Sequence, residues 1–350
     1  MPARDARRRA FRASHRGRAS GCGERSRHEP GRRQDVGMTS PPSRAFASGD
    51  ARRAGATRRF VDAAEWERPF HGVRMPRPIL NPGTHPATRH EQQILARAQA
   101  YCTIMTREAF FSHTTAALLW GLPLPPTTDS DLHVAVLHPA RAPAGRGVHG
   151  HQLHPRGVST RQTQEGLRLT DPVTTWTLLG STLRHPYDLI AVGDAVVSSV
   201  RIAGPHGRIV RDAFAAVDDL HRAVEAVTKR RGIVAIREAL PRVRAGARSR
   251  TESWTRLTLI DGGLPEPELN HDVYDSAGFV ACVDLAYPDR RVGVEYEGDH
   301  HRTDAAQWQR DVERYERLAA AGWRMVRVTR EMLFRQPGLL IRLVEDARAR

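Results

Sequence analysis

The chain has 350 residues, which is long enough for two domains with hydrophobic cores of their own. No apolar run approaches the roughly 20 residues that cross a bilayer, so the composition argues against an integral membrane protein. The net charge of +15 would favour a nucleic-acid partner. Most of this charge lies in residues 1–60, which carry 16 arginines against 5 acidic residues. Residues 251–350, in contrast, carry 14 arginines against 18 acidic residues and are slightly negative.

Cysteine and lysine usage narrow the class of protein further. The three cysteines are odd in number and far apart, at Cys22, Cys102 and Cys282. Such spacing predicts reduced thiols in a cytoplasmic protein. Lys229 is the only lysine, so nearly all of the positive charge is arginine, which we attribute to genomic base composition and not to selection for guanidinium chemistry.

Residues 1–60 are predicted to form a disordered, arginine-rich tail. They lack periodicity and are rich in Arg, Ser, Gly and Pro, so they cannot bury enough apolar surface to fold alone. They contain neither the apolar core of a signal peptide nor a clear amphipathic stripe. Two alternatives stay open: a start codon assigned too early, with Met38 as the true beginning, or a tail that binds nucleic acid.

Residues 61–245 are predicted to form an α+β domain. Ser112 suits the N-cap of a short helix that Gly121 ends, and residues 131–138 alternate in the manner of a strand. Further helices are expected from about residue 172 onward, over 186–200, over 207–228 and over 230–240. Residues 241–249 are predicted to link this domain to the next.

Five histidines lie within residues 133–154, so a zinc site has to be weighed against ordinary surface histidines. Zinc sites favour fixed spacings on rigid elements, in the company of Cys or acidic residues. A strand would place His149 and His151 on one face, but Gly147 and Gly150 loosen that frame. We therefore assign no metal to these histidines from the sequence, which are His133, His138, His149, His151 and His154.

From residue 246 to residue 350 the pattern predicts a second domain with the element order αβββαβα. A helix over about 250–261 is followed by three strands, over about 269–275, 279–287 and 291–297, with turn sequences between them. A helix over about 304–321, a strand at 323–328 and a helical region over 330–349 complete the order. The expected fold class is therefore α/β.

The strands of the second domain carry three carboxylates, at Asp284, Glu295 and Glu297. Alternation puts Glu295 and Glu297 on the face opposite Val292 and Val294, and a tight turn makes Asp284 a neighbour of Glu295. Like charges held so close are costly unless a proton or a cation is shared, and oxygen ligands favour Mg²⁺ or Mn²⁺ over zinc. The alternative is a solvated face on which nearby arginines pair with these carboxylates.

The element order and the stretch "VDLAYPDRRVGVEYEGDHH" resemble a known nuclease family. A helix with Glu, a strand with Asp, then Glu-x-Lys or a variant on the next strand, is the layout of the PD-(D/E)xK core. More closely, residues 249–345 resemble the very-short-patch-repair-like endonuclease family. The resemblance implies a restriction-endonuclease-like core with a central mixed sheet, which cleaves DNA with Mg²⁺ or Mn²⁺.

The resemblance also implies roles for individual residues. Asp284 would be the bridging metal ligand and Glu295 its partner, while His301 matches the family histidine that acts as a general base or acid. The adjacent His300 is a weaker candidate. Two more residues match the acid–arginine pair of the family or, alternatively, form only a surface ion pair: Asp311 and Arg314.

The chain departs from the broader superfamily at one catalytic position. Glu297 stands where the superfamily has lysine, so one transition-state cation is absent, and a domain without activity is the alternative. Glu252 has two interpretations as well. It closes a capping box with Ser249 at the start of a helix, and it also stands where the family places a glutamate that assists the metal site.

The first domain has a looser resemblance, which transfers no catalytic residue. The sequences "SHTTAALLWGLPLP" and "LTDPVTTWTLLG", within about residues 90–200, resemble AbiEi-type abortive-infection antitoxin-like proteins. The combined prediction is a metal-dependent DNA endonuclease of the very-short-patch-repair-like kind, with DNA as its partner and without a small-molecule cofactor. The alternatives are a catalytically inactive DNA-binding regulator of the antitoxin type, and a domain at 61–245 that binds another protein.

Overall fold

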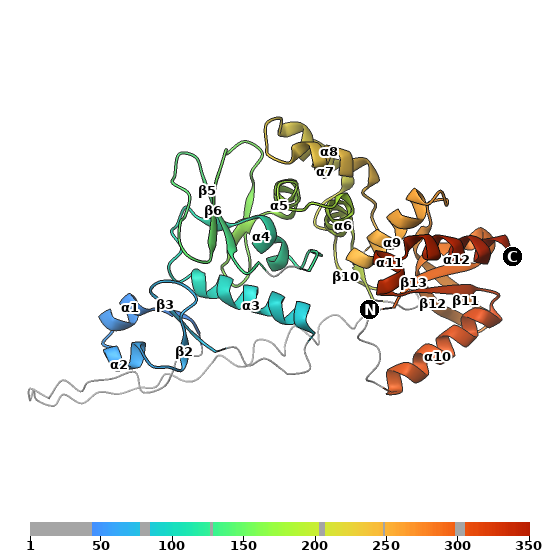
Figure 1. Ribbon diagram of the computed structural model, residues 1–350, viewed down its shortest axis with the longest axis horizontal. Helices are drawn as coiled ribbons and strands as arrows, with labels where there is room; N and C mark the ends of the chain where they lie inside the picture. The colour runs from blue at the N-terminus through green and yellow to red at the C-terminus, as the bar shows by residue number, and fades with distance from the viewer. Residues whose placement is uncertain (1–43, 78–84, 127–128, 203–206, 248, 298–304) are drawn as a thin grey trace, which may run out of the picture. The chain divides into compact units, whose positions relative to one another are not determined.

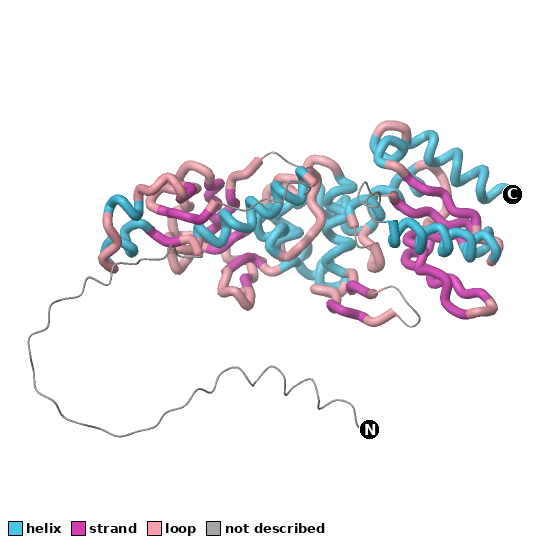
Figure 2. Tube along the Cα trace, turned by 90° about the horizontal axis from the view of Figure 1, so that it is seen from below, coloured by secondary structure: helices cyan, strands magenta, loops and turns pink. Residues whose placement is uncertain are grey.

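Residues 249–350 fold into a four-stranded mixed sheet with helices on both of its faces (Figures 1 and 2). The strand order is β11-β12-β13-β14, in which the first three strands are antiparallel and β14 runs parallel to β13. The elements are α9 (Arg250–Asp261), β11 (Glu268–Asp275), β12 (Gly278–Tyr287), β13 (Val292–Tyr296), α10 (Ala305–Ala320), β14 (Arg324–Val328), α11 (Arg330–Phe334) and α12 (Pro337–Ala349). The predicted α/β class and the predicted αβββαβα order are confirmed.

The computed structural model describes residues 44–77, 85–126, 129–202, 207–247, 249–297 and 305–350. Within these ranges no helix combines the length and the apolarity that crossing a bilayer requires.

Each face of this sheet has its own core. On one face Val292 and Val294 pack with Leu259 of α9 and with Leu340 of α12. On the other face strand residues pack with Leu318 of α10. This division follows the alternation of β13, because residues 292 and 294 point to one side and residues 293 and 295 to the other.

A five-stranded sheet of order β6-β5-β4-β8-β7 forms the centre of residues 85–170. Strands β5 and β6 are parallel, and α3 and α4 pack against the sheet through a core that includes Phe111, Val134 and Ile94. The predicted strand at 131–138 and the predicted short helix before Gly121 are confirmed. The elements are α3 (Pro86–Tyr101), β4 (Phe110–Phe111), α4 (His113–Leu119), β5 (Leu132–Leu137), β6 (Val148–Leu153), β7 (Thr160–Gln162) and β8 (Arg168–Thr170).

Residues 172–242 are mainly helical and pack around Trp176, which is fully buried and donates from its indole N–H to the carbonyl of Leu189 at 2.9 Å. The predicted helix over 207–228 was wrong in its first half, because Ile209–Arg211 pairs with Val200–Arg201 as a two-stranded sheet. The elements are α5 (Pro172–Leu179), α6 (Pro186–Val197), β9 (Val200–Arg201), β10 (Ile209–Arg211), α7 (Val217–Ala226), α8 (Ile233–Ala239) and a 3₁₀ turn (Leu240–Arg242).

Residues 44–76 are folded, which corrects the prediction of a disordered tail as far as residue 60. Phe46, Phe60 and Trp66 contact one another, with ring centroids 5.2–6.0 Å apart. These aromatic residues supply the apolar surface that we judged to be lacking. Residues 1–43, including Met38, lie outside the described residues. The elements are β1 (Phe46–Ala47), α1 (Ser48–Arg53), α2 (Arg58–Val61), β2 (Trp66–Glu67) and β3 (Val73–Pro76).

Helix α9 contributes to two cores. Its Leu257 packs with the helical residues around Trp176, whereas Leu259 packs with the C-terminal sheet. Between α6 and α9 the carboxylate of Asp194, fully buried, accepts hydrogen bonds from Arg256 at 3.0 Å and from Ser253 at 2.7 Å. Residues 241–247 of the predicted linker are therefore packed, with Val243 and Ala247 buried, and the described residues from 44 onward belong to one compact unit.

Candidate functional site

Strands β12 and β13 bring two of the predicted metal ligands to neighbouring positions. A tight turn at Pro288–Arg290 joins the strands, and Leu285 pairs with Val294 in antiparallel register. The pairing extends from Tyr287 and Val292 to Leu285 and Val294, and Asp284 and Glu295 are the next residue on each strand. That their two carboxylates meet, as strand parity and the short turn predict, stays a prediction.

The backbone around Asp284 departs from a regular strand. Val283 packs in the core under α10, whereas Leu285 packs in the core on the other face, although residues two apart should share a face. On the neighbouring strand, Asn270 has a left-handed backbone with φ of 52°. Irregular strand geometry of this kind re-aims a side chain and is common beside active sites. Asp284 itself is half-buried.

Glu295 is buried and is held by two side chains of α10. Its side-chain oxygens Oε1 and Oε2 accept one hydrogen bond each from Nη1 and Nη2 of Arg314, both at 2.9 Å, and Oε2 also accepts from the Tyr315 hydroxyl at 2.9 Å. Burial alone would lower the pKa of Arg314, but the Glu295 carboxylate outweighs burial and raises it. Burial and the same carboxylate raise the pKa of the Tyr315 hydroxyl. The negative charge of Glu295 is thus compensated by protein groups.

The predicted acid–arginine pair on α10 is present only as a distant contact. Nε of Arg314 lies 4.0 Å from Oδ1 of Asp311, the longest ion-pair distance in the described residues, whereas the guanidinium of Arg314 binds Glu295 in a fork. A bidentate arginine–carboxylate pair is stronger than a single long contact. The principal partner of Arg314 is therefore Glu295, which the helical spacing did not indicate.

Glu297 lies apart from this arrangement. Its carboxylate forms an ion pair with Arg327 of β14, and its backbone N–H donates to the carbonyl of Val328 at 2.9 Å. For Glu297 the alternative of pairing with an arginine, weighed from the sequence, is the one that the geometry shows. In the part of the chain that is described, groups of three potential metal ligands within 4.8 Å of one another do not include Asp284, Glu295 or Glu297.

The remaining predicted site residues have different outcomes. Ser249 caps α9, because its hydroxyl accepts from the backbone N–H of Glu252 at 3.1 Å. Glu252 is buried, and it belongs to no group of three potential metal ligands among the described residues. The cap supports the structural role of Ser249, and a role of Glu252 at a metal site stays a prediction. His300 and His301 lie outside the described residues.

The donor set on β12 and β13 fits a hard divalent cation in its chemistry. Within the described residues, Oε1 of Glu295 accepts one hydrogen bond and Oε2 accepts two. A carboxylate offers about four lone-pair sites, so Oε1 has room for one more partner. Asp284 supplies a second carboxylate at the neighbouring position. The pair would hold Mg²⁺ or Mn²⁺ only together with water or substrate oxygens.

Sequence reasoning missed two features of the candidate sites. The first is Tyr315, whose hydroxyl binds Glu295. The second is His113, which comes together with His133 and His151 from residues 20 and 38 positions away. For the tyrosine a signal existed, because a buried tyrosine hydroxyl usually has a hydrogen-bond partner. For the histidine no local signal exists, because the contact depends on how α4 packs on β5 and β6.

Comparison with known proteins finds sequence similarity to two mycobacterial proteins. No protein-family model matches the sequence. It is similar to the uncharacterized protein MT2308 of Mycobacterium tuberculosis strain CDC 1551 / Oshkosh and to the uncharacterized protein Rv2248 of strain ATCC 25618 / H37Rv. Each is 32% identical to it over 250 residues, which cover 71% of this chain and 85% of the mycobacterial protein. At this identity and coverage, the chain belongs to one protein family with these two mycobacterial proteins.

Proposed function

We propose that the C-terminal domain is a metal-dependent endonuclease that hydrolyses phosphodiester bonds of DNA, of the very-short-patch-repair-like kind. The observation that carries the proposal is the position of Asp284 and Glu295. They lie on neighbouring antiparallel strands of a mixed sheet whose helix and strand order is that of the PD-(D/E)xK core. The sequence "EYEGDHH", which begins at Glu295 of β13, supports the same family.

The chemistry requires a cation that the two carboxylates would hold between them. Bound Mg²⁺ or Mn²⁺ would supply a more acidic water and would stabilise charge on the phosphate. Arg314 orients the Glu295 carboxylate through its two hydrogen bonds, and Tyr315 adds a third. His301 is the proposed general base or acid, on the strength of the family resemblance.

A second candidate function is a DNA-binding regulator of the antitoxin type without catalytic activity. The observation in its favour is that both glutamates are neutralised by arginines: Glu295 by Arg314, and Glu297, at the position of the superfamily lysine, by Arg327. A fold that compensates these charges by itself does not need an ion for stability. The resemblance of the first domain to AbiEi-type proteins agrees with this alternative, as does a protein partner for residues 61–245. Either function places the protein in the cytoplasm, where the three cysteines of the sequence would stay reduced.

The test is nicking of supercoiled plasmid by the purified full-length protein with Mg²⁺ or Mn²⁺. We expect cutting that chelator abolishes. The isosteric changes Asp284→Asn and Glu295→Gln should reduce the rate by about 100-fold or more, because each removes a charged ligand and leaves the local shape intact. Glu295→Gln is preferred over alanine because it can still accept a hydrogen bond from Arg314.

The matched control is Asp289→Asn, an exposed carboxylate in the turn between the same two strands. It should cut like the wild type. Equal cutting by wild type, Asp284→Asn and Glu295→Gln would identify a contaminating nuclease and contradict the proposal. Full DNA binding without any metal-dependent cutting would favour the regulator instead.

A further inference from the structure

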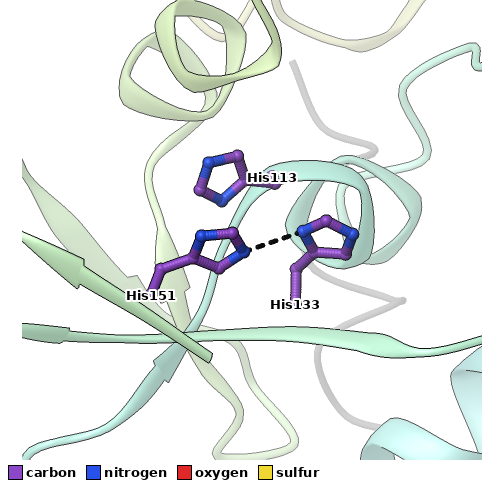
Figure 3. Close-up of side chains that lie close together, drawn as sticks. All are labelled: His113, His133 and His151. Carbon is purple, nitrogen blue, oxygen red and sulfur yellow. Dashed lines mark hydrogen bonds between the residues drawn. The ribbon is translucent and has the colours of Figure 1, made fainter. Parts of the chain in front are cut away.

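Three imidazoles meet in the first domain, far along the chain from the carboxylate strands (Figure 3). His113 is the first residue of α4, His133 lies on β5 and His151 on the adjacent parallel strand β6. One ring nitrogen from each can be chosen so that all three lie within 4.8 Å of one another. His133 Nδ1 lies 2.9 Å from His151 Nε2, and the rings of His113 and His151 stack with centroids 3.9 Å apart. We refer to these three residues as the histidine cluster.

His113 and His133 are buried, and His151 is half-buried. Burial, with help from the neighbouring imidazoles, lowers the pKa of His113 to about 2 and that of His133 to about 4. Burial also lowers the pKa of His151. Neutral imidazole is the form that binds a metal, since a protonated ring has no lone pair to give. A metal would therefore not have to displace protons from this cluster near neutral pH.

The backbone and the neighbour of His113 point to a role beyond packing. Its φ of 47° is in the left-handed region, a strained conformation for a non-glycine residue that clusters at functional sites. Ser112 Oγ lies 2.9 Å from His113 Nδ1. A metal-binding histidine usually has such a partner on its second nitrogen, which fixes the tautomer and the ring orientation. The serine thus leaves Nε2 of His113 as the nitrogen for a ligand.

The cluster forms part of the wall of a cavity of about 590 Å³. His113 and His151 face this cavity, and its rim carries Arg156, Lys229 and Arg231. Aspartate and glutamate are absent from the described residues that line it. The cavity is therefore cationic and accessible, and an anion would be its preferred occupant.

We propose that His113, His133 and His151 bind one Zn²⁺ or a similar divalent transition metal, whose open coordination position faces this cationic cavity and takes an anion of the phosphate class. Three histidines with a fourth position left to water or substrate are the donor set of catalytic zinc sites. Two nitrogens on one tetrahedral zinc lie about 3.3 Å apart when each bond is about 2.0–2.1 Å. The 2.9 Å contact between His133 and His151 therefore has to widen only slightly.

A second group shares His133 and is the weaker choice. Ligand atoms of Asp129, His133 and His149 also lie within 4.8 Å of one another, but Asp129 and His149 are both exposed. His149 Nε2 lies 3.5 Å from Asp129 Oδ2, which is an ordinary surface contact. The cavity is lined by His113 and His151 and not by this second group. The geometry favours the histidine cluster.

The experiment is a titration of chelator-treated full-length protein with Co²⁺, followed by visible absorption, and with Zn²⁺ in equilibrium dialysis. The protein carries Asp284→Asn, so that the proposed nuclease site does not contribute. We expect one metal per chain. His113→Asn and His151→Asn should each weaken binding by about 100-fold or more, since loss of even an outer partner costs 10–100-fold. Ser112→Ala, which removes only that outer partner, should weaken it by about 10–100-fold.

His149→Asn and His138→Asn are the matched controls, because both are exposed histidines on or beside the strands that carry His151 and His133. They should leave the affinity within about threefold of the wild type. Absence of stoichiometric binding by the wild type would overturn the proposal. A loss of metal affinity in His149→Asn but not in His113→Asn would also overturn the proposal. If the cluster variants fail to fold, X-ray absorption of the zinc-loaded wild type decides, because three imidazole nitrogens at about 2.0–2.1 Å are expected.

The anion half of the proposal has its own readout. Inorganic phosphate should change the visible spectrum of the Co²⁺ protein, and Arg156→Ala should weaken that response without changing the metal affinity. A spectrum that phosphate leaves unchanged would show that the open position does not accept an anion. All of these measurements are independent of nuclease activity.

Discussion

At the scale of single residues, the two candidate sites handle buried polar groups in opposite ways. The Glu295 carboxylate is charged and buried, and it is compensated by the guanidinium of Arg314 and the hydroxyl of Tyr315. The imidazoles of His113 and His133 are buried without a carboxylate in contact, and they avoid the cost of a buried charge by remaining unprotonated. The buried Glu295 carboxylate needs a specific partner, whereas the unprotonated imidazoles keep lone pairs that a metal could use.

The neutral histidines make the stability of the metal-free protein depend on pH. The unfolded chain protonates them near pH 6.5, whereas the folded chain holds their pKa values at about 4 for His133 and about 2 for His113. Between these values the unfolded state binds more protons, so their contribution is complete above about pH 6.5 and is lost as the pH falls. From pH 7 to pH 5 we expect a loss of about 2–4 kcal/mol from the two residues together.

Urea unfolding at pH 7 and pH 5 measures this loss. The double variant His113→Gln/His133→Gln should show a smaller difference between the two pH values than the wild type does. The same substitution at His71, an exposed residue outside the cluster, should leave the difference as it is. If the double variant and the wild type lose equal stability on acidification, the imidazoles are not kept neutral by the fold.

At the scale of elements, the junction of α6 and α9 contains a fully buried ion pair between Asp194 and Arg256. Asp194 accepts from Arg256, from Ser253 and from the backbone N–H of Arg244 at 2.7 Å. Burial raises the pKa of Asp194, while Arg256 opposes that change. Removing one partner of such a pair leaves the other charge buried and uncompensated.

Asp194→Ala should therefore destabilise the protein by about 3 kcal/mol, which is the lower end of the usual cost of breaking a buried ion pair. The lower end is expected because Arg256 still has Glu266 as a second partner, at 2.9 Å. The double change Asp194→Ala/Arg256→Met should recover much of this loss, because no charge stays buried. Denaturant unfolding of both variants provides the measurement, with Asp218→Ala on the exposed face of α7 as the control. An Asp194→Ala protein as stable as that control would mean that the pair contributes little.

The elements of the C-terminal domain were predictable because their signals are local. Alternating apolar residues, two turn sequences and a helix with one apolar face lie in order along the chain, and each observed element agrees with the prediction to within a few residues. For the site, the antiparallel pairing of the two strands that carry Asp284 and Glu295 was predictable from the short turn between them. The partner of Glu295 was not, because Arg314 is brought to it by how α10 lies across the sheet. The strand pair β9 and β10 was missed because short strands carry too few residues for a period to be visible.

At the scale of the whole molecule, positive charge is concentrated at the N-terminal end. Residues 1–43 carry 11 arginines against 4 acidic residues. The described structure begins at residue 44, and the aromatic residues Phe46 and Phe60 pack on Trp66. Residues 44–60 carry the other 5 of the 16 arginines of residues 1–60 against one acidic residue, so the basic part of the sequence continues into the first packed part.

Two truncations test this division. A chain that begins at residue 44 should melt like the full-length protein, bind DNA non-specifically with lower affinity and show a flatter dependence of that affinity on salt, because fewer phosphates are neutralised. A chain that begins at residue 61 loses Phe46 and Phe60 and should be less stable. Thermal unfolding and DNA binding at several salt concentrations distinguish the two. Equal salt dependence before and after removal of residues 1–43 would mean that their arginines do not contact DNA.

The position of helix α9 between two cores has a consequence for how the protein unfolds. Leu257 belongs to the core around Trp176, and Leu259 belongs to the core of the C-terminal sheet. Unfolding of either core would therefore expose apolar residues of α9 and would destabilise the other core. We therefore expect the helical core around Trp176 and the core of the C-terminal sheet to unfold together. A ligand that binds the folded carboxylate strands would then also stabilise the helical core, without any change of shape between the two.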